Sequence, residues 1–198
     1  MTGAIPAKAL PSTVPVPVTI SFGRGAAIVY RRPAMRHFFT RHQSPVSSRN
    51  ALVGGAGACL AVASLGLAGD LSGITLLFAP LGATCVLLFA VPASPLSQPV
   101  NVILGHALAG LIGLGAHLAV PGQVWPAAAA VGLAIGLMAW FRITHPPAGA
   151  TTLVTYAGAQ SLAFLAFPVL SGALGLVLLA AFYHRMTGTA YPLKVRRA

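Results

Sequence analysis

Acidic side chains are almost absent from this 198-residue sequence, which contains one acid, Asp70, against twelve lysines and arginines. Paired carboxylates for general acid–base catalysis are therefore excluded. No G-x-S-x-G sequence marks a nucleophilic serine. We expect no enzymatic activity and no catalytic residue. Proton-coupled cation carriers usually place carboxylates at membrane depth, so the scarcity of acids also argues against a cation as substrate.

Cysteine is nearly as scarce. Cys59 and Cys85 both lie inside apolar stretches and form no C-x-x-C pair, so we interpret them as small buried residues. His106 and His117 would share one helix face, but their spacing separates them by roughly 16 Å along the axis. That distance is far too long for two ligands of one metal ion. The sequence predicts no metal site and no cofactor.

Charged residues of either sign make up only 7% of the chain, whereas hydrophobic residues make up 57% and the mean hydropathy is +0.84. Soluble domains are about a quarter charged. The net charge of +11 would suit nucleic-acid binding, but the arginines stand in the N-terminal tail or at the ends of apolar segments. We interpret them as topology determinants that also attract anionic lipid. The sequence predicts an all-α, polytopic membrane protein that binds no nucleic acid.

The chain divides into two tails and a membrane region. Residues 1–50 are rich in proline, serine and arginine, which predicts a disordered basic tail. Residues 51–185 form the transmembrane domain, and residues 186–198 a basic C-terminal tail. Apolar segments follow one another with almost no loop between them, at 51–69, 73–91, 99–120, 124–141, 143–159 and 160–184. Each full segment approaches the roughly 20 residues that cross a bilayer.

Arginine placement predicts the topology. Both basic tails should lie in the cytoplasm, with the domain in a cell inner membrane of bacterial type, and this requires an even number of crossings. About six transmembrane segments place Arg142 on the cytoplasmic side too. Four crossings, with 73–91 and 143–159 as re-entrant hairpins, place it outside. The positive-inside rule favours six.

Two of the segments are interrupted at matching places. The sequence PLGAT at Pro80–Thr84 matches PAGAT at Pro147–Thr151 with an offset of 67 residues. Each lies in the middle element of a three-element unit, 51–120 or 124–185. Because each unit would cross the membrane an odd number of times, the second would be inverted relative to the first. Inverted repeats with broken helices are typical of transporters, whose substrate sites lie near the midplane where the broken segments meet.

Each P-x-G-A-T sequence is expected to begin a half-helix. Proline suits the first turn, glycine permits close approach, and the free N–H groups and positive dipole end favour an anion. The alternative is that these small residues form a helix-packing surface. The interpretation as an anion site includes the following residues of the two segments: Pro80, Gly82, Ala83, Thr84, Pro146, Pro147, Gly149, Ala150 and Thr151.

Histidines and amides supply further polar groups. His145 precedes two prolines and would bind an anion or carry a proton, or else orient the Pro-Pro turn. His106 lies at membrane depth, where an ionisable group is a functional candidate. Arg142 either steers an anion or marks the membrane boundary. We expect Ser94, Gln98 and Asn101 to line the approach.

The chain resembles the HPP family of small integral membrane proteins over roughly residues 50–185. The resemblance is carried by THPPAGAT (144–151), APLGATCVLLF (79–89) and PASPLSQPVNVILGH (92–106). Some plant and cyanobacterial members are regarded as nitrite transporters, so the resemblance implies nitrite as substrate. The family is often described with four spans, against the six expected here.

A transporter or channel for a small anion is therefore the predicted function, with the lipid bilayer as its environment. The alternative is a membrane scaffold or assembly partner that moves no solute and uses its glycines for packing. The sequence does not distinguish a carrier from a channel, and a homo-oligomer is compatible with it.

Overall fold

The computed structural model describes residues 18–22, 26–30, 38–158 and 161–193. The chain forms two compact units, Met1–Pro45 and Val46–Ala198. In the first unit, strands β1 (Val18–Phe22) and β2 (Ala26–Tyr30) pair antiparallel, with Val18 opposite Tyr30 and Phe22 opposite Ala26. The sequence predicts a disordered basic tail over residues 1–50, and this strand pair is the regular structure described in residues 18–30.

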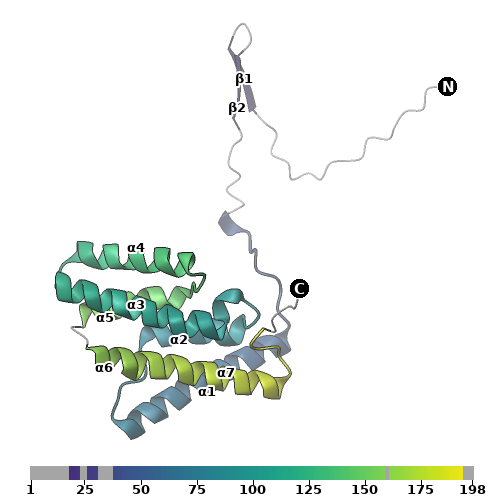
Figure 1. The fold of residues 1–198 in the computed structure, drawn as a ribbon. Helices are drawn as coiled ribbons and strands as arrows, with labels where there is room; N and C mark the ends of the chain where they lie inside the picture. The colour runs from purple at the N-terminus through teal and green to yellow at the C-terminus, as the bar shows by residue number, and fades with distance from the viewer. Residues whose placement is uncertain (1–17, 23–25, 31–37, 159–160, 194–198) are drawn as a thin grey trace. The chain divides into compact units, whose positions relative to one another are not determined.

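The second unit is helical among its described residues and contains the following elements: α1 (Ser48–Ser72), α2 (Ala79–Cys85), the π-helix η2 (Val86–Ala90), the 3-10 helix η3 (Pro95–Ser97), α3 (Pro99–Ala119), α4 (Val124–Trp140), α5 (Pro146–Ala157), α6 (Leu162–Phe164), the π-helix η4 (Leu165–Leu170) and α7 (Ser171–Thr187). Figure 1 shows α3 lying between α4 and α7. Because α2 continues into η2, and α6 and η4 into α7, the elements make up six helical segments with bounds close to those predicted.

Local sequence sets the ends of these helices. The Ser47 side chain caps α1 by accepting from the Asn50 N–H at 3.2 Å. Gly73 ends α1 with φ 69°, a left-handed conformation that glycine adopts without steric cost. Prolines occupy the first turns of α2, α3 and α5, where a missing N–H is harmless.

Three of the described helices are long and apolar enough to cross a membrane: Ser48–Ser72, Pro99–Ala119 and Leu162–Thr187. The helices Ala79–Ala90 and Val124–Trp140 are apolar but shorter. The fold is therefore an all-helical membrane domain, as the sequence predicts, with full-length helices and shorter ones side by side.

The first short segment runs antiparallel to α1 for nearly its whole length. Ile74 and Leu76 lie beside Gly69, and Leu77 beside Gly66. At the other end, Phe89 packs against Gly54 and Gly57. The helical part of this segment, Ala79–Ala90, is about 18 Å long for its twelve residues. The extended chain before α2 runs along the remaining length of α1.

The second short segment, α5, runs parallel to α3. His145 lies beside Gly105, Thr151 beside Gly110, and Thr155 beside Gly113. The absence of a side chain on these glycines lets the two helices pack with their backbones close together. At the far end His117 Nδ1 donates to the Tyr156 carbonyl at 2.6 Å.

Candidate functional site

Thr84 lies at the centre of a buried polar cluster. Its Oγ1 is 2.9 Å from His106 Nε2 and 2.9 Å from His145 Nε2. The same oxygen is 3.0 Å from the Pro80 carbonyl, one turn earlier in α2. All three side chains, Thr84, His106 and His145, are 0% exposed.

The cluster continues from each histidine. His106 Nδ1 is 2.8 Å from Thr151 Oγ1 on α5, and Thr151 is likewise 0% exposed. His145 Nδ1 donates to the Leu96 carbonyl at 2.9 Å. The two imidazole rings meet edge to face with centroids 5.1 Å apart. His106 therefore joins the threonines of the two P-x-G-A-T sequences, although their positions in the chain are 67 residues apart.

Helical periodicity explains which motif residues reach the cluster. In each P-x-G-A-T motif the proline precedes the threonine by four residues. Pro80 and Thr84 therefore share a helix face, as do Pro147 and Thr151. All four are buried. The other predicted residues of the two segments are less buried: Gly82, Ala83, Pro146 and Ala150 are exposed and Gly149 is half-buried.

A side chain added at Gly82 or Gly149 would meet no atom within 4 Å. The structure thus brings the threonines and histidines of the predicted set together, and places the glycines and alanines outside the cluster. A periodicity argument applied to five residues could have made this distinction, because the third residue lies about 200° around the helix from the first.

The remaining predicted residues shape the connector between η2 and α3. The Ser94 side chain accepts from the Leu96 N–H at 3.2 Å. Gln98 Nε2 donates to the carbonyls of Pro92 at 3.0 Å and Ser94 at 2.8 Å. Asn101 Nδ2 donates to the Thr144 carbonyl at 3.0 Å. These contacts hold the Leu96 carbonyl against His145, so the three residues position the cluster without joining it.

A second histidine contact ties the C-terminal part to the first half of the domain. His184, 2% exposed, donates from Nε2 to the Leu88 carbonyl at 2.8 Å, inside the π-helix η2. Tyr191 Oη donates to the Ser97 carbonyl at 3.1 Å, and burial raises the pKa of this phenol, which keeps it protonated. Tyr183 Oη donates to the Val53 carbonyl at 2.8 Å. For these residues the sequence predicts only the end of the last apolar segment and the start of the C-terminal tail.

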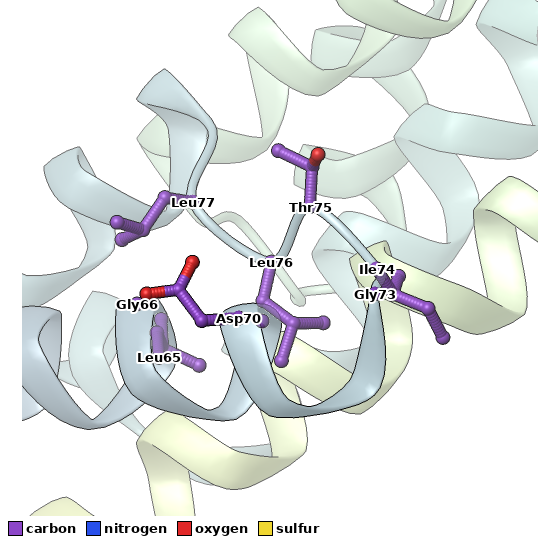
Figure 2. Close-up of a pocket in the computed structure, with 9 residues that line it drawn as sticks. Leu65, Gly66, Asp70, Gly73, Ile74, Thr75, Leu76 and Leu77 are labelled. Carbon is purple, nitrogen blue, oxygen red and sulfur yellow. The ribbon is translucent and has the colours of Figure 1, made fainter.

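The one acid of the chain lies away from the cluster. Asp70 lines an open pocket of about 410 Å³ between the end of α1 and the extended residues Gly73–Leu77. Figure 2 shows its carboxylate pointing toward that extended chain. A carboxylate repels anions, so this pocket is poorly suited to an anion.

Charges are divided between the two ends of the domain. Arg49 lies in the first turn of α1 and Arg185 in the last turn of α7, ends that the Tyr183 contact to Val53 holds together. Arg142 lies between α4 and α5, near Thr144, whose carbonyl contacts Asn101 at the start of α3. Asp70 stands at the opposite end of α1.

Metal binding receives no support from the described residues, where no group of three or more His, Cys, Asp or Glu side chains is placed to hold an ion. The cluster is instead a chain of hydroxyls and imidazoles. Each of its side chains can donate a hydrogen bond, and none carries a negative charge.

Comparison with known proteins decides the family. The sequence model described as "HPP, transmembrane region" matches residues 43–192. The chain belongs to the HPP transmembrane family. No solved structure matches it.

Two Dictyostelium discoideum proteins, each named only as a transmembrane protein, are similar to this HPP protein. One is 37% identical over 120 residues, which cover 56% of this chain and 42% of that protein. The other is 38% identical over 106 residues, which cover 50% of this chain and 34% of that protein. The matched part of this HPP protein thus spans less than half the length of these curated relatives.

Proposed function

We propose that this HPP protein is a transporter or channel for a small anion, with nitrite as the first anion to test because of the family resemblance. The observation that carries the proposal is the cluster of Thr84, His106, His145 and Thr151, which is fully buried and hydrogen-bonded. Polar and ionisable groups inside a membrane are costly, so their presence indicates a function. Hydroxyl and imidazole donors suit an anion, and family membership is consistent with transport in general.

The proposed site lies between the two P-x-G-A-T sequences. Support comes from the directions of the two short segments: 73–90 runs antiparallel to the first helix of its unit, α1, and α5 runs parallel to α3. With six crossings, the two short segments traverse the membrane in opposite senses and the two units form an inverted repeat. Broken segments that meet in this way are a common site of solute binding.

The described conformation would be an occluded one. Each of the four side chains is 0% exposed, so no solute reaches them without movement. We expect α2 and α5 to separate during transport, because Thr84 and His145 form the direct side-chain link between these two helices. A carrier that alternates between two open states fits this requirement better than a permanently open channel.

A membrane scaffold that moves no solute is the second candidate function. The observation that favours it is the same complete burial, since a cluster whose members satisfy one another can serve packing alone. The two functions differ in one measurable property, which is anion flux.

Reconstitution into liposomes tests the proposal. We expect uptake of nitrite, and its competition by other small anions, in vesicles containing the purified protein and not in protein-free vesicles. The double variant His145→Ala with Thr151→Val should abolish it. Thr152→Val is the matched control, because Thr152 is also 0% exposed on α5 but its hydroxyl has no hydrogen-bond partner. Absence of flux for every anion would favour the scaffold, and flux that is equal in the double variant would contradict the proposed site.

Topology is tested separately with a single cysteine. We propose an inner-membrane protein with both termini and Arg142 in the cytoplasm, supported by the placement of Arg49, Arg142 and Arg185 toward one end of the domain. In a background lacking Cys59 and Cys85, cysteine at position 142 should react with a membrane-impermeant reagent only after the cells are opened. Labelling of intact cells at position 142 would instead support four crossings.

A further inference from the structure

The Leu96 carbonyl fixes the proton position on His145. A carbonyl oxygen accepts hydrogen bonds and cannot donate them, so His145 Nδ1 must carry the hydrogen in their 2.9 Å contact. In the neutral imidazole the other nitrogen, Nε2, is then an acceptor. Any additional proton on His145 therefore has one position to occupy, Nε2, which faces Thr84.

Thr84 has more partners than it has hydrogens. Its hydroxyl carries one hydrogen and two lone pairs. Three groups stand around Oγ1: the Pro80 carbonyl at 3.0 Å, His106 Nε2 at 2.9 Å and His145 Nε2 at 2.9 Å. The Pro80 carbonyl only accepts, so which group receives the Thr84 hydrogen depends on how many of the two imidazole nitrogens donate.

With His145 neutral, one arrangement of hydrogens fits the histidine contacts. Thr84 donates to His145 Nε2, His106 donates from Nε2 to Thr84, and Thr151 donates to His106 Nδ1. The Pro80 carbonyl then loses the Thr84 hydrogen, although the two oxygens stay 3.0 Å apart. Two facing acceptors without a hydrogen between them are unfavourable.

With one proton added to His145 Nε2, every contact in the cluster is satisfied. His145 and His106 both donate to the Thr84 oxygen, and the Thr84 hydroxyl turns to donate to Pro80. The added proton thus requires a rotation of one hydroxyl and no movement of a heavy atom.

Protonation of His106 fits less well. A second hydrogen on this ring would have to be donated from Nδ1 to Thr151 Oγ1. Thr151 would then keep its own hydrogen without an acceptor, because the described contacts give its hydroxyl no partner besides His106. The two histidines are therefore not equivalent: an added proton leaves every contact satisfied on His145 but not on His106.

Among the described residues, no negatively charged group contacts His145 to balance its charged form. His106 is the titratable side chain in contact with His145, and it is neutral in both arrangements. Arg142 is exposed and of the same sign. Its hydrogen-bond partners from α2 and the connector are the Thr84 hydroxyl and the Leu96 carbonyl, and Asp70 lines a different pocket. An imidazolium that is 0% exposed without an anion nearby is strongly disfavoured.

We propose that His145 takes up one proton together with each monovalent anion, so that this HPP protein is a proton–anion symporter. The inference rests on the proposed anion transport and names its coupling ion. The proton binds at Nε2, the anion supplies the missing negative charge, and the pair crosses without net charge. Neither ion is expected to bind well alone, because each stabilises the bound form of the other.

Binding measurements on the purified protein test the coupling. With nitrite as the probe, the apparent affinity should rise about tenfold for each unit of decrease in pH while His145 is mostly neutral. Calorimetry in buffers of different ionisation enthalpy should give one proton taken up per nitrite bound. Affinity that does not change with pH would overturn the inference.

Variants at the two histidines separate coupling from positioning. In His145→Asn the amide can still donate to Leu96 but cannot gain a proton, so the pH dependence of nitrite binding should disappear. In His106→Gln the amide can still donate toward Thr84, so binding should weaken while the pH dependence persists. Thr152→Val should leave both unchanged. Equal pH dependence in His145→Asn and the natural protein would overturn the assignment.

Vesicle experiments distinguish failure of the coupling from failure of transport. An inward proton gradient should accelerate nitrite uptake over that of protein-free vesicles, which measure the unaided crossing of nitrous acid, and an imposed membrane potential should not affect the uptake. Protein-dependent flux that follows the membrane potential and ignores the proton gradient would overturn symport and leave anion transport intact. Absence of both binding and flux would overturn the proposed function and the symport together.

Discussion

The two P-x-G-A-T sequences occupy corresponding places in the chain but contribute different chemistry. At the offset of 67 residues, Phe78 corresponds to His145 as the residue that precedes each short helix. His145 contacts Thr84 and the Leu96 carbonyl, whereas the Phe78 ring packs against Phe164 with centroids 6.1 Å apart. An ionisable group therefore precedes the second motif, whereas the first motif contains the hydroxyl that contacts both histidines.

The helices that follow the motifs also differ. α5 is a regular helix from Pro146 to Ala157, while α2 ends at Cys85 and continues as the π-helix η2. The carbonyl of Leu88 in η2 accepts from His184. Similar motifs thus set the position of the threonines, and the surrounding sequence decides what each half contacts.

The largest effect should come from adding a side chain at the contact between α3 and α5. A side chain at Gly113 would collide with the Thr155 hydroxyl and the Thr152 carbonyl, so Gly113→Ala should push α5 away from α3. We expect a loss of stability of about 3 kcal/mol or more. Gly115→Ala is the matched control, because no atom lies within 4 Å of the added carbon. Thermal unfolding in detergent measures both; equal midpoints would contradict the packing described here.

An intermediate effect should separate the two threonines. Thr84→Val removes the hydroxyl that both histidines share, whereas Thr151→Val removes one contact of His106. We expect a cost of about 2–3 kcal/mol for the first and about 1–2 kcal/mol for the second, because buried nitrogens lose their partners. Thr152→Val should cost little, since its hydroxyl has no partner. Chemical denaturation would rank the three, and a larger loss for Thr151→Val would reverse the comparison.

The smallest effect should come from the motif glycines. Gly82→Ala and Gly149→Ala place a carbon where no atom lies within 4 Å. Stability should change by less than about 0.5 kcal/mol apart from the gain in helix propensity, and nitrite flux should remain within about twofold. A strong loss of flux in either variant, with stability retained, would indicate that the glycines line the substrate path, as their sequence pattern suggests.

Helix positions were accessible from sequence because apolar runs and prolines mark them directly. The predicted segments 99–120 and 124–141 correspond to Pro99–Ala119 and Val124–Trp140. Residue type and the internal match also indicate His106, His145 and both threonines as candidates. These are local properties of the chain.

Contacts between distant residues were not accessible in the same way. Nothing in the sequence indicates that Thr84 lies between two histidines, because that depends on how α2, α3 and α5 pack. The Leu96 carbonyl and the π-helix η2 are backbone features without a residue signature. For the motif glycines the sequence leaves two roles open, because their freedom suits both close packing and ligand approach, and only the Cβ positions in the fold distinguish these roles.

The contacts of the last helix have a consequence for how the protein is made. Tyr183, His184 and Tyr191 supply hydrogen bonds to the carbonyls of Val53, Leu88 and Ser97, and the Leu193 N–H donates to Gln98 Oε1 at 2.8 Å. Synthesis proceeds from the N-terminus, so the first half enters the bilayer before these donors exist. The carbonyls of its π-helix and connector therefore lack these partners until Tyr183–Leu193 have been synthesised. The first half of the domain thus reaches its full set of hydrogen bonds only after α7 and the residues that follow it have been made.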